Sequence, residues 1–236
     1  MGIRHPLWNT MNRLGLFAKF WTPGRVKTRL AQTVGDQSAA EIHKALLLHL
    51  LRELSGLKRG PWVVNMDLVF TPSEDREKLE PFCDQWRLVP QCEGDLGRRL
   101  ATYVTDAFSS GDQRVVLIGA DCPFVSGDLI EEAFRRLDSA DVVLGPALDG
   151  GYYLLGLAHP TVQLFENIEW STDRVLEQTM AIVSDSQLVH LFLPKSEDVD
   201  DFDSLRRIAS ELKFSAPGTG KHDLADELDR LMQVSQ

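Results

Sequence analysis

The chain has 236 residues, of which 43% are hydrophobic and 25% are charged, which is typical of a globular protein of one large domain or two small ones. Its net charge of -10 argues against proteins that coat nucleic acids or bind anionic membranes, because both classes normally need a basic surface. The charge is unevenly distributed: four basic residues and no acid occur from Lys19 to Arg29, whereas five acids occur in the seven positions from Glu197 to Asp203.

The predicted strands and helices alternate along almost the whole chain. Apolar and β-branched runs predict strands over 14–20, 62–70, 86–89, 114–118, 141–144, 152–157 and 188–193. Helical spacing predicts helices over 38–57, 74–82, 126–137, 172–183 and 202–212, one more that follows Gly97 and ends near 109, and an amphipathic piece over 224–232. The first of these helices has Ser38 as its expected N-cap and Glu41 as the capping-box partner.

This alternation predicts one α/β domain, with a mainly parallel sheet and helices on both faces. We expect residues 1–13 to form a disordered leader, 14–214 the domain, and 215–236 a tail with a short helix. The three cysteines are odd in number and lack metal-binding spacing, and no run is long enough to cross a membrane, so we expect a cytoplasmic protein.

Four features directly follow predicted strands, where open α/β sheets bind their ligands. The first is a basic loop after the first strand, which contains Gly24 and the charged side chains Arg25, Lys27 and Arg29, with Lys19 just before it. A glycine-containing loop that leads into a helix is suited to holding phosphates, and a solvated basic surface is the alternative interpretation.

The second feature is Asp121, which follows the strand RVVLI in the sequence GADCP. A carboxylate beyond a fully apolar strand is well placed to hold a divalent cation, although an aspartate that caps a turn would look the same. The third is the segment GPALDGGYY, whose two glycines allow close approach of a ligand, and which could also be a simple hairpin turn.

The fourth feature is the acidic run from Glu197 to Asp203. Asp201 and Asp203 are explained by the positive end of the helix dipole that follows. Asp198 and Asp200 lie before that helix, where repulsion between neighbouring carboxylates favours a bound cation. The basic loop and the acidic run together indicate a site for a polyphosphate and a magnesium ion.

Six motifs along the chain occur in the order in which they occur in a known protein family. They are FAKFWTPGRVKTRLA, GDLGRRL, IGADCP, VVLGPALDGGYYLLGL, the tripeptide Trp170-Ser171-Thr172, and DVDDFDSL. Across about 14–212 the chain resembles a bacterial glycosyltransferase-like family, the selenodomain-associated transferase type, within the nucleotide-diphospho-sugar transferase superfamily. The resemblance implies the GT-A fold, a Rossmann-like sandwich of three layers.

The resemblance also implies roles for particular residues. The resemblance places Gly24, Arg25 and Lys27 on the nucleotide phosphates; the charges of the basic loop add Lys19 and Arg29, and the GDLGRRL motif adds Gly97. Those expected to bind substrate on the acceptor side are Gly150, Gly151, Tyr152, Trp170, Ser171 and Thr172, the last three being equally compatible with a helix N-cap. Asp121 and Asp200 match the acids that hold Mg²⁺ or Mn²⁺ in the superfamily.

Three functions remain compatible with these residues. The resemblance favours a glycosyltransferase that uses an NDP-sugar, with Lys27 stabilising the leaving phosphate, Asp121 holding the metal and Asp149 acting as the base for a small-molecule acceptor; the other two functions are alternatives. A nucleotidyltransferase similar to guanylyltransferases would instead grip the β and γ phosphates of an NTP in the basic loop. A protein that binds nucleotides without turnover is the third.

Overall fold

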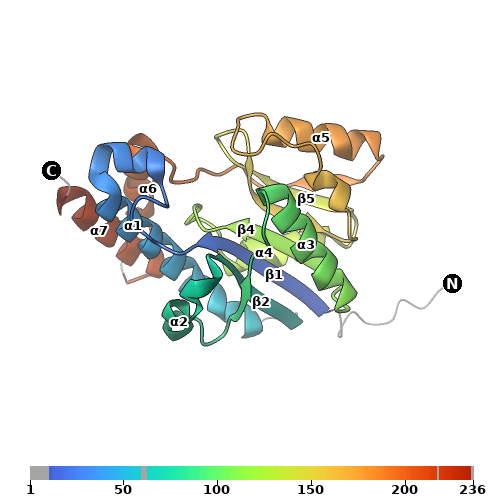
Figure 1. The fold of residues 1–236 in the computed structure, drawn as a ribbon, viewed down its shortest axis with the longest axis horizontal. Coiled ribbons are helices and arrows are strands. Elements are labelled where there is room, and N and C mark those ends of the chain that lie inside the picture. Colours follow the sequence, from blue (N-terminus) through green and yellow to red (C-terminus); the bar gives the residue numbers. More distant parts are fainter. Residues whose placement is uncertain (1–10, 60–62, 217, 235–236) are drawn as a thin grey trace.

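The structure is a computed structural model that describes residues 11–59, 63–216 and 218–234, so residues 1–10 of the predicted leader lie outside it. A seven-stranded sheet crosses the domain in the order β3-β2-β1-β4-β6-β5-β7 (Figure 1). The strands are β1 (Met11–Lys19), β2 (Val63–Thr71), β3 (Arg87–Pro90), β4 (Arg114–Gly119), β5 (Val142–Pro146), β6 (Tyr152–Leu157) and β7 (His190–Phe192). All neighbours are parallel except β6, which is antiparallel to β4 and β5. The predicted α/β fold with a mainly parallel sheet is confirmed.

Helices cover both faces of this sheet and complete a three-layer sandwich (Figure 1). They are α1 (Thr28–Glu53), α2 (Arg76–Leu79), α3 (Leu96–Ser109), α4 (Gly127–Arg136), α5 (Val175–Asp185), α6 (Phe202–Leu212) and α7 (Gly220–Val234), with short 3-10 turns at Leu54–Arg59, Ser73–Asp75, Glu80–Phe82 and Val162–Phe165. The continuous apolar run of β4 is explained by burial on both sides: Val116 and Ile118 pack in the core of α1, α2 and α4, and Val115 and Leu117 in that of α3 and α5. Among the described residues, no helix has the length and apolar character needed to cross a bilayer.

Helix α1 begins ten residues earlier than predicted, at Thr28 rather than Ser38, and Ser38 lies inside it. The reason is a break at Gly35, whose φ of 81° and ψ of 160° interrupt the helical path without ending the helix. Glycine adopts a positive φ without steric cost, so the chain can kink here and continue. The predicted helix therefore corresponds to the part of α1 that follows the kink.

The chain ends also differ from the predicted domain boundaries. β1 starts at Met11, so its first residues fall inside the segment predicted as a disordered leader. At the other end, α7 packs against α1 and α6 through Leu224 and Leu228, both buried. In Figure 1 these three helices lie together at one end of the molecule. The segment predicted as a tail is therefore part of the packed domain.

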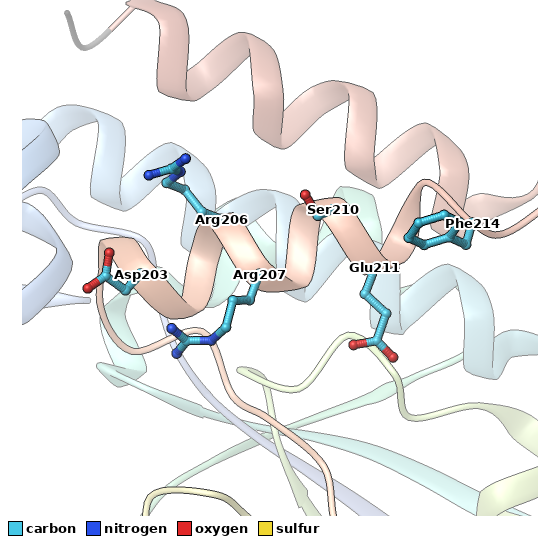
Figure 2. A pocket seen from close by; sticks show the side chains of 6 residues that line it. All are labelled: Asp203, Arg206, Arg207, Ser210, Glu211 and Phe214. Atoms are coloured by element: carbon cyan, nitrogen blue, oxygen red, sulfur yellow. The ribbon is translucent and has the colours of Figure 1, made fainter.

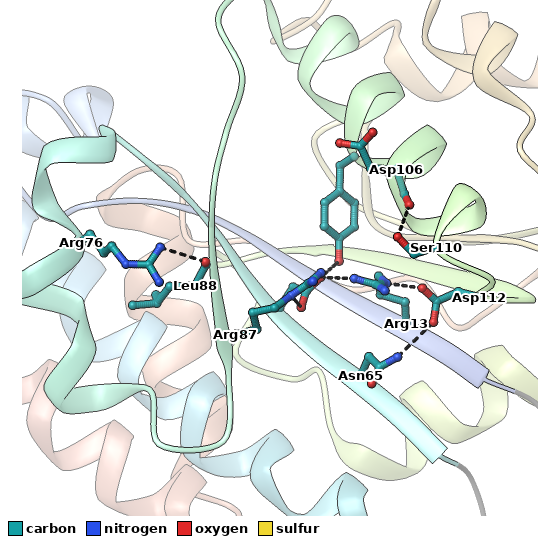
Figure 3. A network of polar contacts seen from close by, with 10 residues as sticks. Arg13, Asn65, Arg76, Arg87, Leu88, Asp106, Ser110 and Asp112 are labelled. Atoms are coloured by element: carbon teal, nitrogen blue, oxygen red, sulfur yellow. Dashed lines mark hydrogen bonds and ion pairs between the residues drawn. The ribbon is translucent and has the colours of Figure 1, made fainter.

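A buried ionic network joins strands β1, β2 and β3 to α3 (Figure 3). Asp67, whose side chain is only 1% exposed, accepts hydrogen bonds from Arg13 at 2.9 Å and from Arg87 at 2.7 and 2.9 Å. The Tyr103 hydroxyl donates to the same carboxylate at 2.8 Å, and Arg13 also pairs with Asp112. Burial, followed by the charge of Asp67, raises the pKa of Tyr103 above its usual range, so it remains a hydrogen-bond donor.

Substituting Asp67 by Ala is expected to lower the free energy of unfolding by about 3–5 kcal/mol, because the buried Arg13 guanidinium loses one of its two counter-ions and Tyr103 loses its acceptor. Urea unfolding followed by circular dichroism measures the change. The matched control is Asp106→Ala on α3, an exposed residue whose carboxylate makes no ion pair with another described residue, and we expect a change below about 0.5 kcal/mol. Equal effects of the two substitutions would contradict a structural role for the network.

Candidate active site

A cavity of about 1150 Å³ lies at the carboxyl ends of the parallel strands. Predicted site residues that line it are Lys19, Arg25, Lys27, Arg29, Asp121, Asp149, Gly151, Tyr152, Trp170, Ser171, Thr172 and Asp200, whereas Gly24, Gly97 and Gly150 do not. Six parallel strands end at this edge, and the antiparallel β6 begins there, so segments far apart in sequence meet around one space. This placement agrees with the position of ligand sites in open α/β sheets.

A smaller pocket of about 480 Å³ lies elsewhere, along one side of α6 (Figure 2). It is lined by Asp203, Arg206, Arg207, Ser210, Glu211 and Phe214. Arg207 is held by Glu197 at 2.6 Å, and none of the predicted site residues lies in this pocket. The larger cavity is therefore the candidate active site.

Lys27 lines this cavity and contacts two segments that are far apart in the sequence. Its ammonium nitrogen lies 2.6 Å from Oδ1 of Asp121 and also donates to the carbonyl of Val199. The side chain is only 6% exposed, and the backbone at Lys27 adopts a left-handed conformation, with φ 48° and ψ 45°, directly before α1. The basic loop thus directs this lysine inward, onto the carboxylate that follows β4.

Asp121 is held on one side and accessible on the other. His43 Nδ1 lies 3.5 Å from its Oδ1, while His43 Nε2 contacts the Lys19 carbonyl at 3.0 Å. Burial would raise the pKa of Asp121, but the Lys27 ammonium, assisted by His43, outweighs it and holds the pKa well below its usual range. Because 44% of the side chain is exposed, an ionised carboxylate faces the cavity.

The acidic run contributes two aspartates with different surroundings. Asp200 is half exposed and pairs with Arg29 at the surface. Asp198 lines the cavity, and its Oδ1 is buried without a hydrogen-bond partner among the described residues. Burial raises the pKa of Asp198 to about 7, and the nearby charge of Asp121 acts in the same direction. The backbone N–H of the next residue, Val199, donates to the Asp121 carbonyl at 3.0 Å, which places Asp198 beside Asp121. The prediction from sequence instead singles out Asp200.

Asp121 and Asp198 fit the requirements of a magnesium or manganese ion. Carboxylate oxygens are the ligands these cations prefer, and a buried oxygen without a partner gains one on binding. In the described part of the chain, no group of three or more histidine, cysteine, aspartate or glutamate residues forms a metal cage. Mg²⁺ commonly uses one or two carboxylates and completes its shell with water and substrate phosphates.

The acceptor side of the cavity is built from the β5–β6 turn and the segment before α5. Asp149 is exposed, and its Oδ1 accepts the Gly151 backbone N–H at 2.9 Å, a contact that fixes the turn. The turn is therefore a hairpin as well as a cavity wall. Tyr152 lines the cavity, but its hydroxyl is buried beside Thr179 and does not face the cavity as a free donor.

The tripeptide 170–172 does not cap a helix, because α5 starts only at Val175 with Arg174 before it. Instead, Thr172 donates to the carbonyl of Glu169 at 2.7 Å, which fixes this loop at the cavity rim. The N-cap interpretation of these residues is therefore wrong. The indole of Trp170 lies against Gly97 of α3, where a methyl group would be 2.7 Å from Nε1.

Gly97→Ala is therefore expected to destabilise the fold by about 1–3 kcal/mol, because its methyl group would also lie 2.6 Å from the carbonyl oxygen of Phe165. Thermal unfolding measures the loss, and Gly56→Ala is the matched control, since nothing lies within 4 Å of a Cβ there and its φ is not in the positive region. Retention of full stability in Gly97→Ala would show that the Trp170 loop moves freely away from α3.

Two residues of the central cluster were not identified from sequence as partners of Asp121. His43 lies within the predicted helix and has no metal-ligand spacing, so only the fold brings it to Asp121. Asp198 was noted in the acidic run, but nothing in a run of similar carboxylates indicates which one is buried.

The chain is similar to several known proteins. A family model described as "Uncharacterized protein conserved in bacteria (DUF2064)" matches residues 58–172. The crystal structure of a protein from Desulfovibrio desulfuricans, provisionally assigned as a nucleotide-diphospho-sugar transferase, is 30% identical in sequence, with a TM-score of 0.81. That match covers 95% of this chain and 97% of the other.

Among curated proteins, 2-phospho-L-lactate guanylyltransferase of Methanocaldococcus infernus is 26% identical over 137 residues, 58% of this chain. The chain spans only 57% of that relative. The crystal structure of 4-diphosphocytidyl-2C-methyl-D-erythritol synthase from Anaerococcus prevotii has a TM-score of 0.57 at 11% identity, covering 86% of this chain and 99% of that one, which supports the fold alone. The curated relative is a transferase, and the Desulfovibrio protein is provisionally assigned as one.

Proposed function

We propose that the chain, which belongs to the family described as uncharacterized protein conserved in bacteria (DUF2064), is a metal-dependent nucleotidyltransferase. It would move a nucleotidyl group from a nucleoside triphosphate to a small acceptor. The observation that supports this most is the arrangement of one cavity in which the basic loop faces the Asp121 and Asp198 carboxylates.

The charges suit a triphosphate. Lys27 and Arg29 are engaged with Asp121 and Asp200, but among the described residues Lys19 and Arg25 have no carboxylate partner. These two cationic side chains line the cavity and would bind the phosphate oxygens of a triphosphate. The curated guanylyltransferase relative supports the same reaction class.

In the reaction, an oxygen of the acceptor attacks the α-phosphorus, the bond from that phosphorus to the bridging oxygen breaks, and pyrophosphate leaves. Lys19 and Arg25 would bind the departing pyrophosphate, and Lys27 would keep Asp121 ionised and oriented. A divalent cation held by Asp121 and Asp198 would add Lewis-acid charge at the phosphates.

Glycosyl transfer from an NDP-sugar is the second candidate, favoured by the exposed Asp149 carboxylate in the cavity wall. Asp149 would take the proton of an acceptor hydroxyl while the bond from the sugar to the diphosphate breaks. The Desulfovibrio protein, provisionally assigned to nucleotide-diphospho-sugar transferases, supports this alternative.

Incubation of the full chain with Mg²⁺, each of four NTPs and a panel of NDP-sugars separates the two reactions, with small-molecule extract as the source of acceptors. Pyrophosphate release from an NTP is expected. Release of a nucleoside diphosphate from an NDP-sugar would support the glycosyltransferase instead. Binding without any release would favour a nucleotide-binding protein, and absence of both binding and release would reject a nucleotide site.

A further inference from the structure

Arg99 is a positive charge in the cavity that the protein does not neutralise. Its Nε donates to the Gly94 carbonyl at 2.9 Å and its Nη1 to the side-chain oxygen of Gln91 at 3.0 Å. Both acceptors are uncharged, and within the described ranges no carboxylate lies at ion-pair distance from this guanidinium. Its remaining N–H groups are available to a ligand.

Gln91 fixes the orientation of that guanidinium. Its side-chain nitrogen donates to the carbonyls of Ala18 at 3.2 Å and Val69 at 2.9 Å, and its backbone N–H donates to Phe70 at 2.8 Å. The glutamine is thereby anchored on the ends of β1 and β2, and its oxygen is directed toward Arg99. A side chain fixed in this way loses little conformational entropy when a ligand binds.

The surroundings of Arg99 suit a flat, apolar-faced ligand rather than a phosphate. Leu96 and Leu100, one turn apart on α3, line the same cavity, and Leu96 is 40% exposed although it is apolar. Gln91 follows β3 and its side chain reaches back to the ends of β1 and β2, so Arg99 lies over the β1–β3 part of the cavity.

We propose that Arg99, oriented by Gln91, selects a nucleobase that carries a ring carbonyl oxygen (guanine, cytosine or uracil) and discriminates against adenine. This inference rests on the proposed nucleotide-dependent function. A guanidinium only donates hydrogen bonds, so it pairs with carbonyl oxygens and ring nitrogens, as in its two-point contact with O6 and N7 of guanine. In adenine an amino group replaces O6, and a donor would face a donor.

Isothermal titration with the α,β-methylene analogues of GTP, CTP, UTP and ATP, in the presence of Mg²⁺, tests this inference without turnover. The wild-type chain is expected to bind at least one carbonyl-bearing analogue about tenfold or more tightly than the ATP analogue. Arg99→Met should reduce that preference to within about threefold while leaving affinity for the ATP analogue unchanged.

Two further variants complete the test. Gln91→Leu keeps Arg99 but removes its support, so the preference should fall with little change in the ATP analogue. Arg98→Met, on the neighbouring residue outside the cavity wall, is the matched control and should retain the full preference.

The possible failures are distinguishable. An equal loss of all four affinities in Arg99→Met would mean that Arg99 binds the phosphates or the ribose, which overturns the inference alone. Equal wild-type binding of all four analogues would overturn it too. If no analogue binds to the wild-type chain, the proposed function falls with it.

Discussion

Asp198→Asn is expected to abolish the stabilisation of the protein by Mg²⁺ and nucleotide, lowering apparent metal affinity at least about tenfold. The reason is that Asp198 presents the buried oxygen without a hydrogen-bond partner among the described residues, beside the ionised Asp121. Thermal unfolding measured across a Mg²⁺ titration at fixed nucleotide gives the result.

Two measurements distinguish loss of metal binding in Asp198→Asn from misfolding. Without metal, the Asp198→Asn substitution removes a partly buried carboxylate near the charge of Asp121, so the apo protein should be at least as stable as wild type. Asp200→Asn is the matched control: its exposed pair with Arg29 contributes little, and metal affinity should stay within about fivefold. If Asp200→Asn abolished the metal effect and Asp198→Asn did not, the assignment made from sequence would be correct.

Lys27→Met is expected to destabilise the protein by about 3 kcal/mol, because it leaves Oδ1 of Asp121 and the Val199 carbonyl without their shared donor. The value is at the low end for buried pairs because 44% of the Asp121 side chain is exposed. Asp121→Ala should also be destabilising, since it leaves a buried ammonium without its counter-ion.

A double-mutant cycle tests the coupling directly. Combining Lys27→Met with Asp121→Asn should cost less than the sum of the single changes, with a coupling energy of about 1–3 kcal/mol in urea unfolding. The double variant should regain stability but no turnover. Lys19→Met, at a cavity lysine without a carboxylate partner among the described residues, is the control and should change stability by less than about 0.5 kcal/mol. Strict additivity of the two substitutions would contradict the ion pair.

Much of the fold follows from local pattern. The run RVVLI predicts a buried central strand because its side chains after the arginine are all apolar, and the alternation of strands and helices predicts a mainly parallel sheet. The antiparallel direction of β6 is not visible in its apolar run, because burial on both faces gives the same composition in either direction. The kink at Gly35 likewise hides part of α1 from a search for periodic apolar residues.

The sequence predicts which segments meet at the site, but not which side chains contact one another there. The rule that ligands bind at strand ends correctly brings the basic loop, Asp121 and the DGG segment to one cavity. It does not show that Lys27 points inward, which depends on a left-handed residue before α1, nor that Gln91 and Arg99 form a supported pair. Such contacts depend on side-chain directions set by tertiary packing.

The small apolar cluster that joins α1, α6 and α7 has a consequence for the order in which the chain is made. Leu30 and Val199, which come shortly after Lys27 and Asp198 respectively, belong to this cluster together with Leu224 of α7. A ribosome releases the basic loop and Asp121 long before it releases Asp198 and Asp200, which line the same cavity, and α7, which packs against α1 and α6. Since domains generally fold as units, the growing chain can assemble most of its sheet before the cavity wall is complete. Nascent chains should therefore not sequester nucleotide during synthesis.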